Sequence, residues 1–163
     1  MTEQYKVVVI GMGKRGKHHA TAFNANPKFQ VVGVCDIDRA RAEEAARTLS
    51  SNPAIFTDAN DLVAQIKPDV FCFCTLPTIR LPMIKLGVQS KARLIAFEKP
   101  IALSSAEAMK IRKVLARSKA KVVVSHQHRY GAHYRKVKEI IASGALGRVH
   151  TVYGTATGWM AHM

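Results

Sequence analysis

Three glycines near the amino terminus have the spacing of a phosphate-binding loop. In the stretch VVVIGMGKRG, Gly11, Gly13 and Gly16 form the pattern G-x-G-x-x-G. The pattern lies between an apolar run that should form a strand and a stretch that should form a helix, which is the setting such a loop requires. There the first glycine permits a tight turn, the second lets a diphosphate approach the backbone, and the third lets the helix pack on the strand. We expect a dinucleotide to contact the whole loop, namely Gly11, Met12, Gly13, Lys14, Arg15 and Gly16.

An acidic residue, Asp36, ends the next predicted strand, about 20 residues after Gly16. A carboxylate at that distance can accept hydrogen bonds from the ribose hydroxyls of the adenosine half of a dinucleotide, and it would repel a 2′-phosphate. The spacing therefore favours NAD(H) over NADP(H). NADP(H) stays open because Arg39 and Arg41 lie close by in the sequence. The alternative for Asp36 is an ordinary turn with a helix-capping aspartate.

The fourth predicted strand ends in residues that could border the same ligand crevice. In a doubly wound sheet, ligands bind outside the carboxyl ends of the strands. Thr75, Leu76 and Pro77 follow the apolar run VFCFC and could line the path from the diphosphate to the nicotinamide. A simple turn is an equally good interpretation of these three residues.

The fifth predicted strand runs directly into a charged pair, Glu98 and Lys99, which Pro100 follows. Burial of such a pair would be costly, whereas a cleft at the edge of a sheet can use it. A lysine near a substrate hydroxyl can donate a hydrogen bond, stabilise a developing alkoxide or relay a proton. The alternative is a surface ion pair of small energetic value.

Short apolar runs and amphipathic stretches alternate along the chain, which predicts the elements that must position these residues. We expect strands over residues 6–11, 29–36, 54–56, 70–75, 93–98 and 121–126. Helices are expected over residues 16–26, 39–49, 61–66, 81–89 and 106–118, with Asp38 capping the second, and Ser104 and Glu107 forming a capping box for the last. Continuously apolar strands between helices predict an α/β fold, a doubly wound parallel sheet of Rossmann type.

The composition narrows the class of protein. The chain has 163 residues with 25 basic and 11 acidic side chains, enough for one domain but not for two of full size. No apolar run approaches the ~18 residues that a membrane span needs. Three cysteines lie in apolar runs without metal-ligand spacing, so we expect reduced, buried thiols, a cytoplasmic protein and no metal. The densest basic patch comprises Lys110, Arg112, Lys113, Arg117, Lys119 and Lys121.

The basic patch admits more than one interpretation. A nucleic-acid surface is one, but aromatic residues are not interleaved with the charges as a single-strand binder would need. A solvated helix face, or a surface that meets an acidic partner, explains the charges as well. Nucleic acid is therefore not the partner we expect.

The segments GMGKRGKHH, VCDID, TLP, FEKPIA and HQHRY, in that order, resemble the amino-terminal half of the glucose–fructose oxidoreductase / inositol dehydrogenase (Gfo/Idh/MocA) family. The resemblance implies that Lys99 is the active-site lysine, in contact with the nicotinamide ribose and the reacting hydroxyl, with Glu98 as the acid beside it. It also implies that Gln127 lies next to the nicotinamide and that Arg129 is a candidate substrate contact. His19 matches a histidine with an expected structural role.

The chain departs from the family pattern in three ways. The threonine–proline pair expected after the fourth strand is Thr75–Leu76 here, and the histidine expected a few residues later is Arg80. The third departure is length, because family members continue into a second α/β domain that carries the substrate site. We therefore expect a dinucleotide-binding domain over residues 1–125. Residues 126–163 would form a connecting helix and the first strand, over 148–159, of an incomplete second domain.

These observations predict the nucleotide-binding half of an NAD(P)-dependent dehydrogenase that acts on a sugar or cyclic polyol. The chain alone should bind NAD, or NADP, with little turnover, and the whole enzyme should be a homo-oligomer through its second domain. The alternative is a non-catalytic NAD(P)-binding module that serves as a sensor or as the partner of another subunit. That alternative needs the glycine loop and Asp36 but not Lys99.

Overall fold

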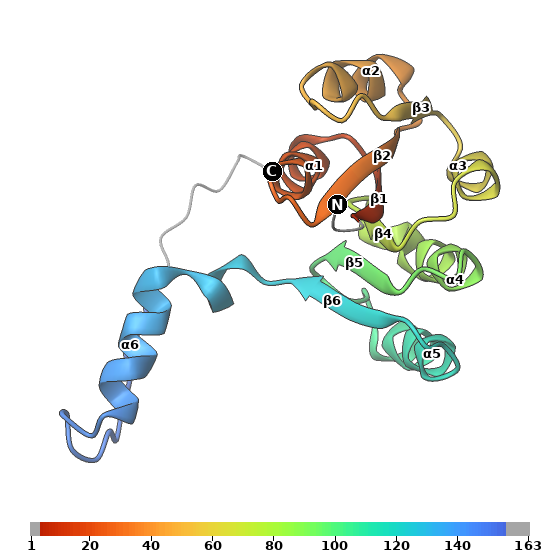
Figure 1. Ribbon diagram of the computed structural model, residues 1–163. Helices are drawn as coiled ribbons and strands as arrows, with labels where there is room; N and C mark the ends of the chain where they lie inside the picture. Colours follow the sequence, from red (N-terminus) through yellow and green to blue (C-terminus); the bar gives the residue numbers. More distant parts are fainter. Residues whose placement is uncertain (1–3, 156–163) are drawn as a thin grey trace. The chain divides into compact units, whose positions relative to one another are not determined.

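The computed structural model describes residues 4–155, which form two compact units that meet at Ser125 and His126. The first unit contains a six-stranded parallel sheet in the order β3-β2-β1-β4-β5-β6 (Figure 1). Its strands are β1 (Tyr5–Ile10), β2 (Phe29–Cys35), β3 (Ala54–Phe56), β4 (Val70–Phe73), β5 (Leu94–Glu98) and β6 (Lys121–Ser125). Its helices are α1 (Lys14–Asn24), α2 (Arg39–Arg47), α3 (Ala59–Gln65), α4 (Arg80–Gln89) and α5 (Ser105–Ala116), with a 3₁₀ turn, η1 (Pro77–Ile79), before α4.

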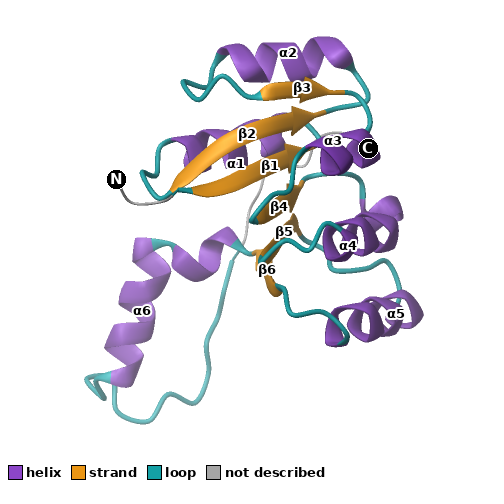
Figure 2. Ribbon diagram, turned by 45° about the vertical axis from the view of Figure 1, so that its right-hand side comes forward, coloured by secondary structure: helices purple, strands orange, loops and turns teal. Residues whose placement is uncertain are grey.

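The sheet has one apolar core on each face, as the continuously apolar strands predict. Along β1, Val7 and Val9 pack into the core that α1 and α2 cover, whereas Val8 and Ile10 pack into the core that α3, α4 and α5 cover. Figure 2 shows the helices divided in this way between the two faces of the sheet. Successive side chains of a strand point to opposite faces, so only strands apolar at every position can fill both cores. The doubly wound Rossmann-type fold is thereby confirmed.

The predicted helix caps are present, except that Glu107 bonds to the residue before the Ser104 cap. The side chain of Asp38 accepts hydrogen bonds from the amides of Ala40 and Arg41 at the start of α2. Ser104 Oγ accepts from the amide of Glu107 at 3.2 Å, which caps α5. Glu107 Oε2 accepts from the amide of Leu103, one residue before the cap, at 3.0 Å.

Four strands, β1, β2, β4 and β6, end earlier than the sequence pattern predicts, and the first three leave candidate site residues beyond their ends. Gly11, Asp36 and Thr75 lie just beyond β1, β2 and β4 rather than within them. The backbone still bonds across the sheet at these points, because Gly11 donates to the carbonyl of Cys35 at 2.7 Å and Asp36 donates to that of Phe56 at 3.2 Å. These residues therefore have fixed positions at the carboxyl edge of the sheet while their other groups are free for different contacts.

The second unit contains a 3₁₀ turn, η2 (Gln127–Tyr130), and the helix α6 (Ala132–Ala142). The predicted connecting helix is therefore present, and its apolar side chains Tyr134, Val137, Ile140 and Ile141 are partly exposed. The strand predicted over 148–159 is wrong for residues 148–155, which form no strand, while residues 156–159 lie outside the described part. A strand exists only through hydrogen bonds to a neighbouring strand, and no described strand pairs with this segment. Within residues 4–155, no helix is long and apolar enough to cross a membrane.

Candidate functional site

The carboxyl ends of β1 and β4 lie side by side at the centre of the sheet, where the strand order reverses direction. From β1 the chain proceeds outward through β2 to β3, and then returns to place β4 on the other side of β1 (Figure 1). The loops that follow these two strands therefore diverge toward opposite faces of the sheet. This is the position at which ligands bind in open α/β sheets.

The three glycines of the loop differ in what an added Cβ atom would meet at each position. Gly11 has a φ of +87°, which L side chains rarely adopt, and a Cβ there would lie 3.0 Å from the carbonyl group of Cys74. A Cβ on Gly16 would lie 1.8 Å from the carbonyl oxygen of Gly11, so α1 starts against the loop only with glycine there. A Cβ on Gly13 would meet no atom within 4 Å. Packing therefore requires Gly11 and Gly16, whereas Gly13 leaves open space beside the loop.

The carboxylate of Asp36 holds the loop through a hydrogen bond to its backbone. Its Oδ2 accepts a hydrogen bond from the amide of Met12 at 2.6 Å, and its Oδ1 accepts one from the amide of Asp38 at 2.9 Å. Asp36 is buried, and the side chain of Met12 is fully buried in the core under α1. Met12 therefore fixes the loop in place, through its amide to Asp36 and through its side chain to the core. A carboxylate can accept about four hydrogen bonds, so each oxygen of Asp36 keeps a free lone pair.

The first turn of α1 meets the conditions for binding a phosphate. Gly13 is the N-cap and no side chain caps the helix there, so the amides of Lys14, Arg15 and Gly16 have no acceptor among the described residues. No acidic residue lies in that first turn. Free amides at the positive end of a helix dipole attract anions. Together with the open space beside Gly13, this arrangement fits the diphosphate of a dinucleotide.

Glu98, at the end of β5, pairs with a residue of α1 and not with the adjacent Lys99. Its Oε1 lies 2.8 Å from Nε2 of His19, and the Glu98 side chain is 10% exposed. Burial alone would raise the pKa of Glu98, but hydrogen bonds with His19 and Ser125 and the charges of His19 and Arg15 outweigh it and lower the pKa. The ionised carboxylate therefore links α1 to the strand that precedes the lysine.

Lys99 is exposed immediately after Glu98 and forms no ion pair with any described residue. The alternative interpretation of residues 98 and 99 as a surface ion pair is therefore wrong. A lysine whose strand is fixed but whose ammonium group is unpaired can meet a ligand at the carboxyl edge of the sheet.

The segment after β4 contains one well-placed polar atom. Thr75 Oγ1 is buried and has no hydrogen-bond partner among the described residues. The backbone of Thr75 lies close to Gly11, because a Cβ on that glycine would be 3.3 Å from the Thr75 amide nitrogen. Leu76 is 73% exposed, and Pro77 begins η1. Of this trio, Thr75 has the clearest unmet hydrogen-bonding capacity beside the glycine loop.

Arg80 has an environment that the sequence does not predict. Its side chain is fully buried at the start of α4, and Nε and Nη1 have no partner among the described residues. The guanidinium carbon lies 5.4 Å and 5.3 Å from the ring centroids of Phe73 and Phe97. Burial lowers the pKa of Arg80, against the opposing influence of Cys74, Glu98 and Glu107. The one sequence signal for this environment is that residue 80 is arginine, where the resemblance to the Gfo/Idh/MocA family predicts histidine.

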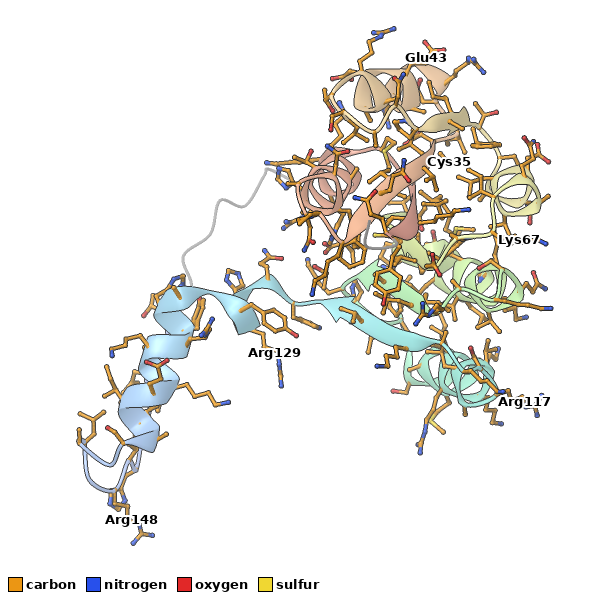
Figure 3. The ribbon with its side chains drawn as sticks, viewed as in Figure 1. Cys35, Glu43, Lys67, Arg117, Arg129 and Arg148 are labelled. Carbon is orange, nitrogen blue, oxygen red and sulfur yellow. The ribbon has the colours of Figure 1, made fainter. Side chains whose placement is uncertain are left out.

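Gln127 and Arg129 belong to η2 in the second unit. Both are exposed there. In the same unit, the ring of His128 packs edge-on against Tyr134 with the ring centroids 5.3 Å apart. Figure 3 labels Arg129 on this segment. Their predicted contacts with cofactor and substrate remain predictions.

Cys35 and Cys72 are buried thiols of low reactivity, whereas Cys74 is partly buried. Burial raises the pKa of Cys35 to about 12, with smaller contributions from Asp58 and Asp36. Hydrogen bonding with Cys74, followed by burial, raises the pKa of Cys72. Thiolates, which are the reactive form, are therefore scarce at neutral pH. The described residues contain no group of three His, Cys, Asp or Glu side chains that could hold a metal ion.

Comparison with known proteins gives concordant matches. The sequence model of the Gfo/Idh/MocA family, described as an oxidoreductase family with an NAD-binding Rossmann fold, matches residues 5–126. An inositol 2-dehydrogenase of Rhizobium meliloti (strain 1021) is 30% identical over 144 residues, which are 88% of this chain and 42% of that protein. The chain thus spans less than half the length of this relative.

Two solved structures share the fold. The myo-inositol 2-dehydrogenase of Lactobacillus plantarum superposes with a TM-score of 0.83 at 21% identity, covering 90% of this chain and 43% of that protein. The scyllo-inositol dehydrogenase of Lactobacillus casei with bound NAD(H) and scyllo-inositol has a TM-score of 0.81 at 22% identity, covering 89% and 43%. At such low identity, these likenesses establish the fold.

Proposed function

The chain belongs to the Gfo/Idh/MocA oxidoreductase family, and from that premise we propose that it is the NAD(H)-binding half of a dehydrogenase acting on a cyclic polyol or sugar. The observation that carries the proposal is the glycine loop. Among the described residues, its amides at the start of α1 have no acceptor, its second glycine faces open space, and the buried carboxylate of Asp36 accepts a hydrogen bond from its backbone. Each of these features serves a bound diphosphate, and only the carboxylate is also needed for folding.

The choice of NAD(H) rests on the rigidity and charge of Asp36. Two backbone hydrogen bonds hold this carboxylate in place, so it cannot turn away from a ligand without losing them. Its free lone pairs accept from the ribose hydroxyls, and its charge opposes a 2′-phosphate. Arg39 lies 2.9 Å from Glu43 and Arg41 lies 3.2 Å from Asp38. These are exposed ion pairs of small energetic value, so the preference for NAD(H) rests on Asp36.

We assign the proton chemistry to Lys99. A bound NAD⁺ would supply the acceptor for a hydride from a carbinol carbon. The ammonium group of Lys99 would donate a hydrogen bond to the reacting oxygen and stabilise negative charge there, and the proton of the hydroxyl would be relayed to a base in the substrate domain. The His19–Glu98 contact holds the strand immediately before Lys99, so the lysine starts from a fixed backbone position. Thr75 offers its unpartnered hydroxyl beside the loop.

The substrate class, the domain division and the assembly are part of the same proposal. A cyclic polyol fits because the relatives named above are inositol dehydrogenases. Residues 126–163 are the connecting helix and beginning of the substrate domain, with Gln127 and Arg129 directed to nicotinamide and substrate. A homo-oligomer is supported by the exposed apolar side chains of Val123 and α6. The three free cysteines support a cytoplasmic location.

The decisive experiment replaces Gly13 with alanine. The added methyl group meets no protein atom within 4 Å but occupies the space assigned to the diphosphate. Calorimetric titration with NAD⁺ should show at least a tenfold loss of affinity. The free energy of unfolding should fall by no more than about 1 kcal/mol, the cost of a poorer N-cap.

Gly154→Ala is the matched control, because a Cβ at Gly154 also meets nothing within 4 Å. That variant should bind NAD⁺ like the unmodified chain. Equal NAD⁺ affinity of Gly13→Ala and the unmodified chain, or no heat of binding from the unmodified chain, would overturn the proposal.

A further inference from the structure

A cavity lies at the edge of the sheet opposite the glycine loop. It has a volume of about 690 Å³ and is lined by the starting residues of several strands, including Tyr5, Phe29, Val70 and Leu94. All strands of the sheet are parallel, so their starting residues lie at the edge farthest from Gly11, Asp36 and Lys99. The cavity is therefore separate from the proposed dinucleotide site. Its volume is within the range of small-molecule sites, about 300–1,000 Å³.

The rim of this cavity is strongly basic. Five of its lining residues are cationic and one is acidic: Lys91, Arg93, Arg117, Lys119 and Lys121 against Asp69. Figure 3 labels Arg117, which follows the end of α5. Asp69 is already engaged, because Oδ2 accepts from the amide of Lys6 at 2.9 Å and Oδ1 lies 3.9 Å from Arg93. The other four cations have no ion-pair partner within residues 4–155.

Helix ends explain only part of this charge. Both α4 and α5 finish beside the cavity, and one or two cations near a helix carboxyl end complement its dipole. Lys119 and Lys121, however, lie beyond the helix, and Lys121 is the first residue of β6. Four unpaired cations around one concave space repel one another, and an anion in that space removes the repulsion.

The wall of the cavity adds an apolar and aromatic component. The rings of Tyr5 and Phe29 have their centroids 5.8 Å apart, and the guanidinium of Arg93 lies 5.0 Å from the Tyr5 ring centroid. Val88, Leu94 and Ala120 complete this surface. An inorganic ion would use the charges but leave the apolar wall in contact with water.

We propose that this cavity binds a small organic anion that carries at least two negative charges on an aromatic or apolar body. The anionic group lies among Lys91, Arg117, Lys119 and Lys121, and the apolar body packs on Tyr5 and Phe29. Because the two sites lie at opposite edges of the sheet, this ligand and a dinucleotide can be bound together. The assignment does not depend on the function proposed for the glycine loop.

The test is a titration of the ¹⁵N-labelled chain with 1-naphthyl phosphate, followed through the backbone amide resonances at constant ionic strength. Saturable shifts should appear at Tyr5, Lys91 and Ala120 and not at Gly13 or Asp36. Inorganic phosphate and 1-naphthol should each bind at least tenfold more weakly, because each satisfies only one half of the cavity. Shifts confined to the glycine loop, or none, would overturn the proposal.

Two double variants separate a site from a general charge effect. The pair Lys119→Glu with Lys121→Glu should weaken binding of 1-naphthyl phosphate at least tenfold. The pair Lys110→Glu with Lys113→Glu changes the net charge equally on exposed residues outside the cavity and should change affinity less than twofold. If the first pair disturbs folding, glutamines at Lys119 and Lys121 should still weaken binding at least threefold. Equal losses from pairs inside and outside the cavity would refute a defined site.

Discussion

Nε2 of His19 lies 2.8 Å from Oε1 of Glu98, a contact between residues 79 positions apart in the chain. His19 belongs to α1, the helix that begins at the glycine loop, and Glu98 is the last residue of β5. The contact therefore joins the element that would hold the diphosphate to the strand that presents Lys99. A bond of this kind fixes the relative position of the two halves of the proposed cofactor site.

Glu98→Gln should lower the free energy of unfolding by about 1–3 kcal/mol at pH 7, because a hydrogen-bonded charge is lost. The pKa of Glu98 is lowered in the folded state. Its contribution is therefore fully present above about 4.3, the pKa of an unfolded glutamate, and is lost as the pH falls through the folded-state pKa. Urea unfolding at pH 7 and at pH 4 should show the difference between the two proteins shrinking at the lower pH.

Glu139→Gln is the control for this prediction, since Glu139 is exposed on α6 and its contact with Lys136 is 3.7 Å. It should change stability by less than about 0.5 kcal/mol at either pH. A deficit for Glu98→Gln that stays constant between the two pH values would assign the effect to packing and not to charge.

The unmodified chain should bind NAD⁺ at least tenfold more tightly than NADP⁺, and Asp36→Asn should reduce that ratio to less than about threefold. The substitution removes the charge that opposes the 2′-phosphate but keeps the shape of the side chain. It also places an amide group opposite the N–H of Met12 or of Asp38, which should cost about 1–2 kcal/mol of stability. Calorimetry with both nucleotides measures the ratio. If the ratio is unchanged, the discrimination between NAD⁺ and NADP⁺ would have to come from Arg39 and Arg41 and not from Asp36.

Gly16→Ala should destabilise the fold, in contrast to Gly13→Ala. The new methyl group would lie 1.8 Å from the carbonyl oxygen of Gly11, which is backbone and cannot move without opening the loop. Overpacking of this kind costs about 1–3 kcal/mol. Thermal unfolding followed by circular dichroism should give a clearly lower midpoint for Gly16→Ala. Similar midpoints for both variants would contradict the tight approach of α1 to the loop.

Arg80→Met should leave the fold equally stable or raise its free energy of unfolding by about 1 kcal/mol. A buried guanidinium with two unpaired nitrogens costs stability, and its contacts with the rings of Phe73 and Phe97 offset only part of that cost. Methionine keeps the length and the apolar contacts. Urea unfolding at pH 7 measures the difference. A loss above about 2 kcal/mol would indicate that the guanidinium has a strong partner in solution.

The fold and the glycine loop follow from the sequence because their causes are local. β-branched runs in which every residue is apolar form strands covered on both faces. The positive φ of Gly11 and the approach of Gly16 to the carbonyl of Gly11 are local requirements as well. The caps at Asp38 and Ser104 are local as well. The strand predicted after α6 failed for residues 148–155 because pairing depends on a neighbour and not on composition.

Contacts between residues distant in sequence depended on the tertiary structure. The bond from Met12 to Asp36 spans 24 positions, and only the parallel pairing of β1 with β2 brings the two together. The same reason applies to the partner of Glu98, to the burial of Arg80 against the stacked rings of Phe73 and Phe97, and to the basic cavity. Local patterns specify which elements form and which faces are apolar. The packing of those elements decides which polar groups meet and which remain without a partner.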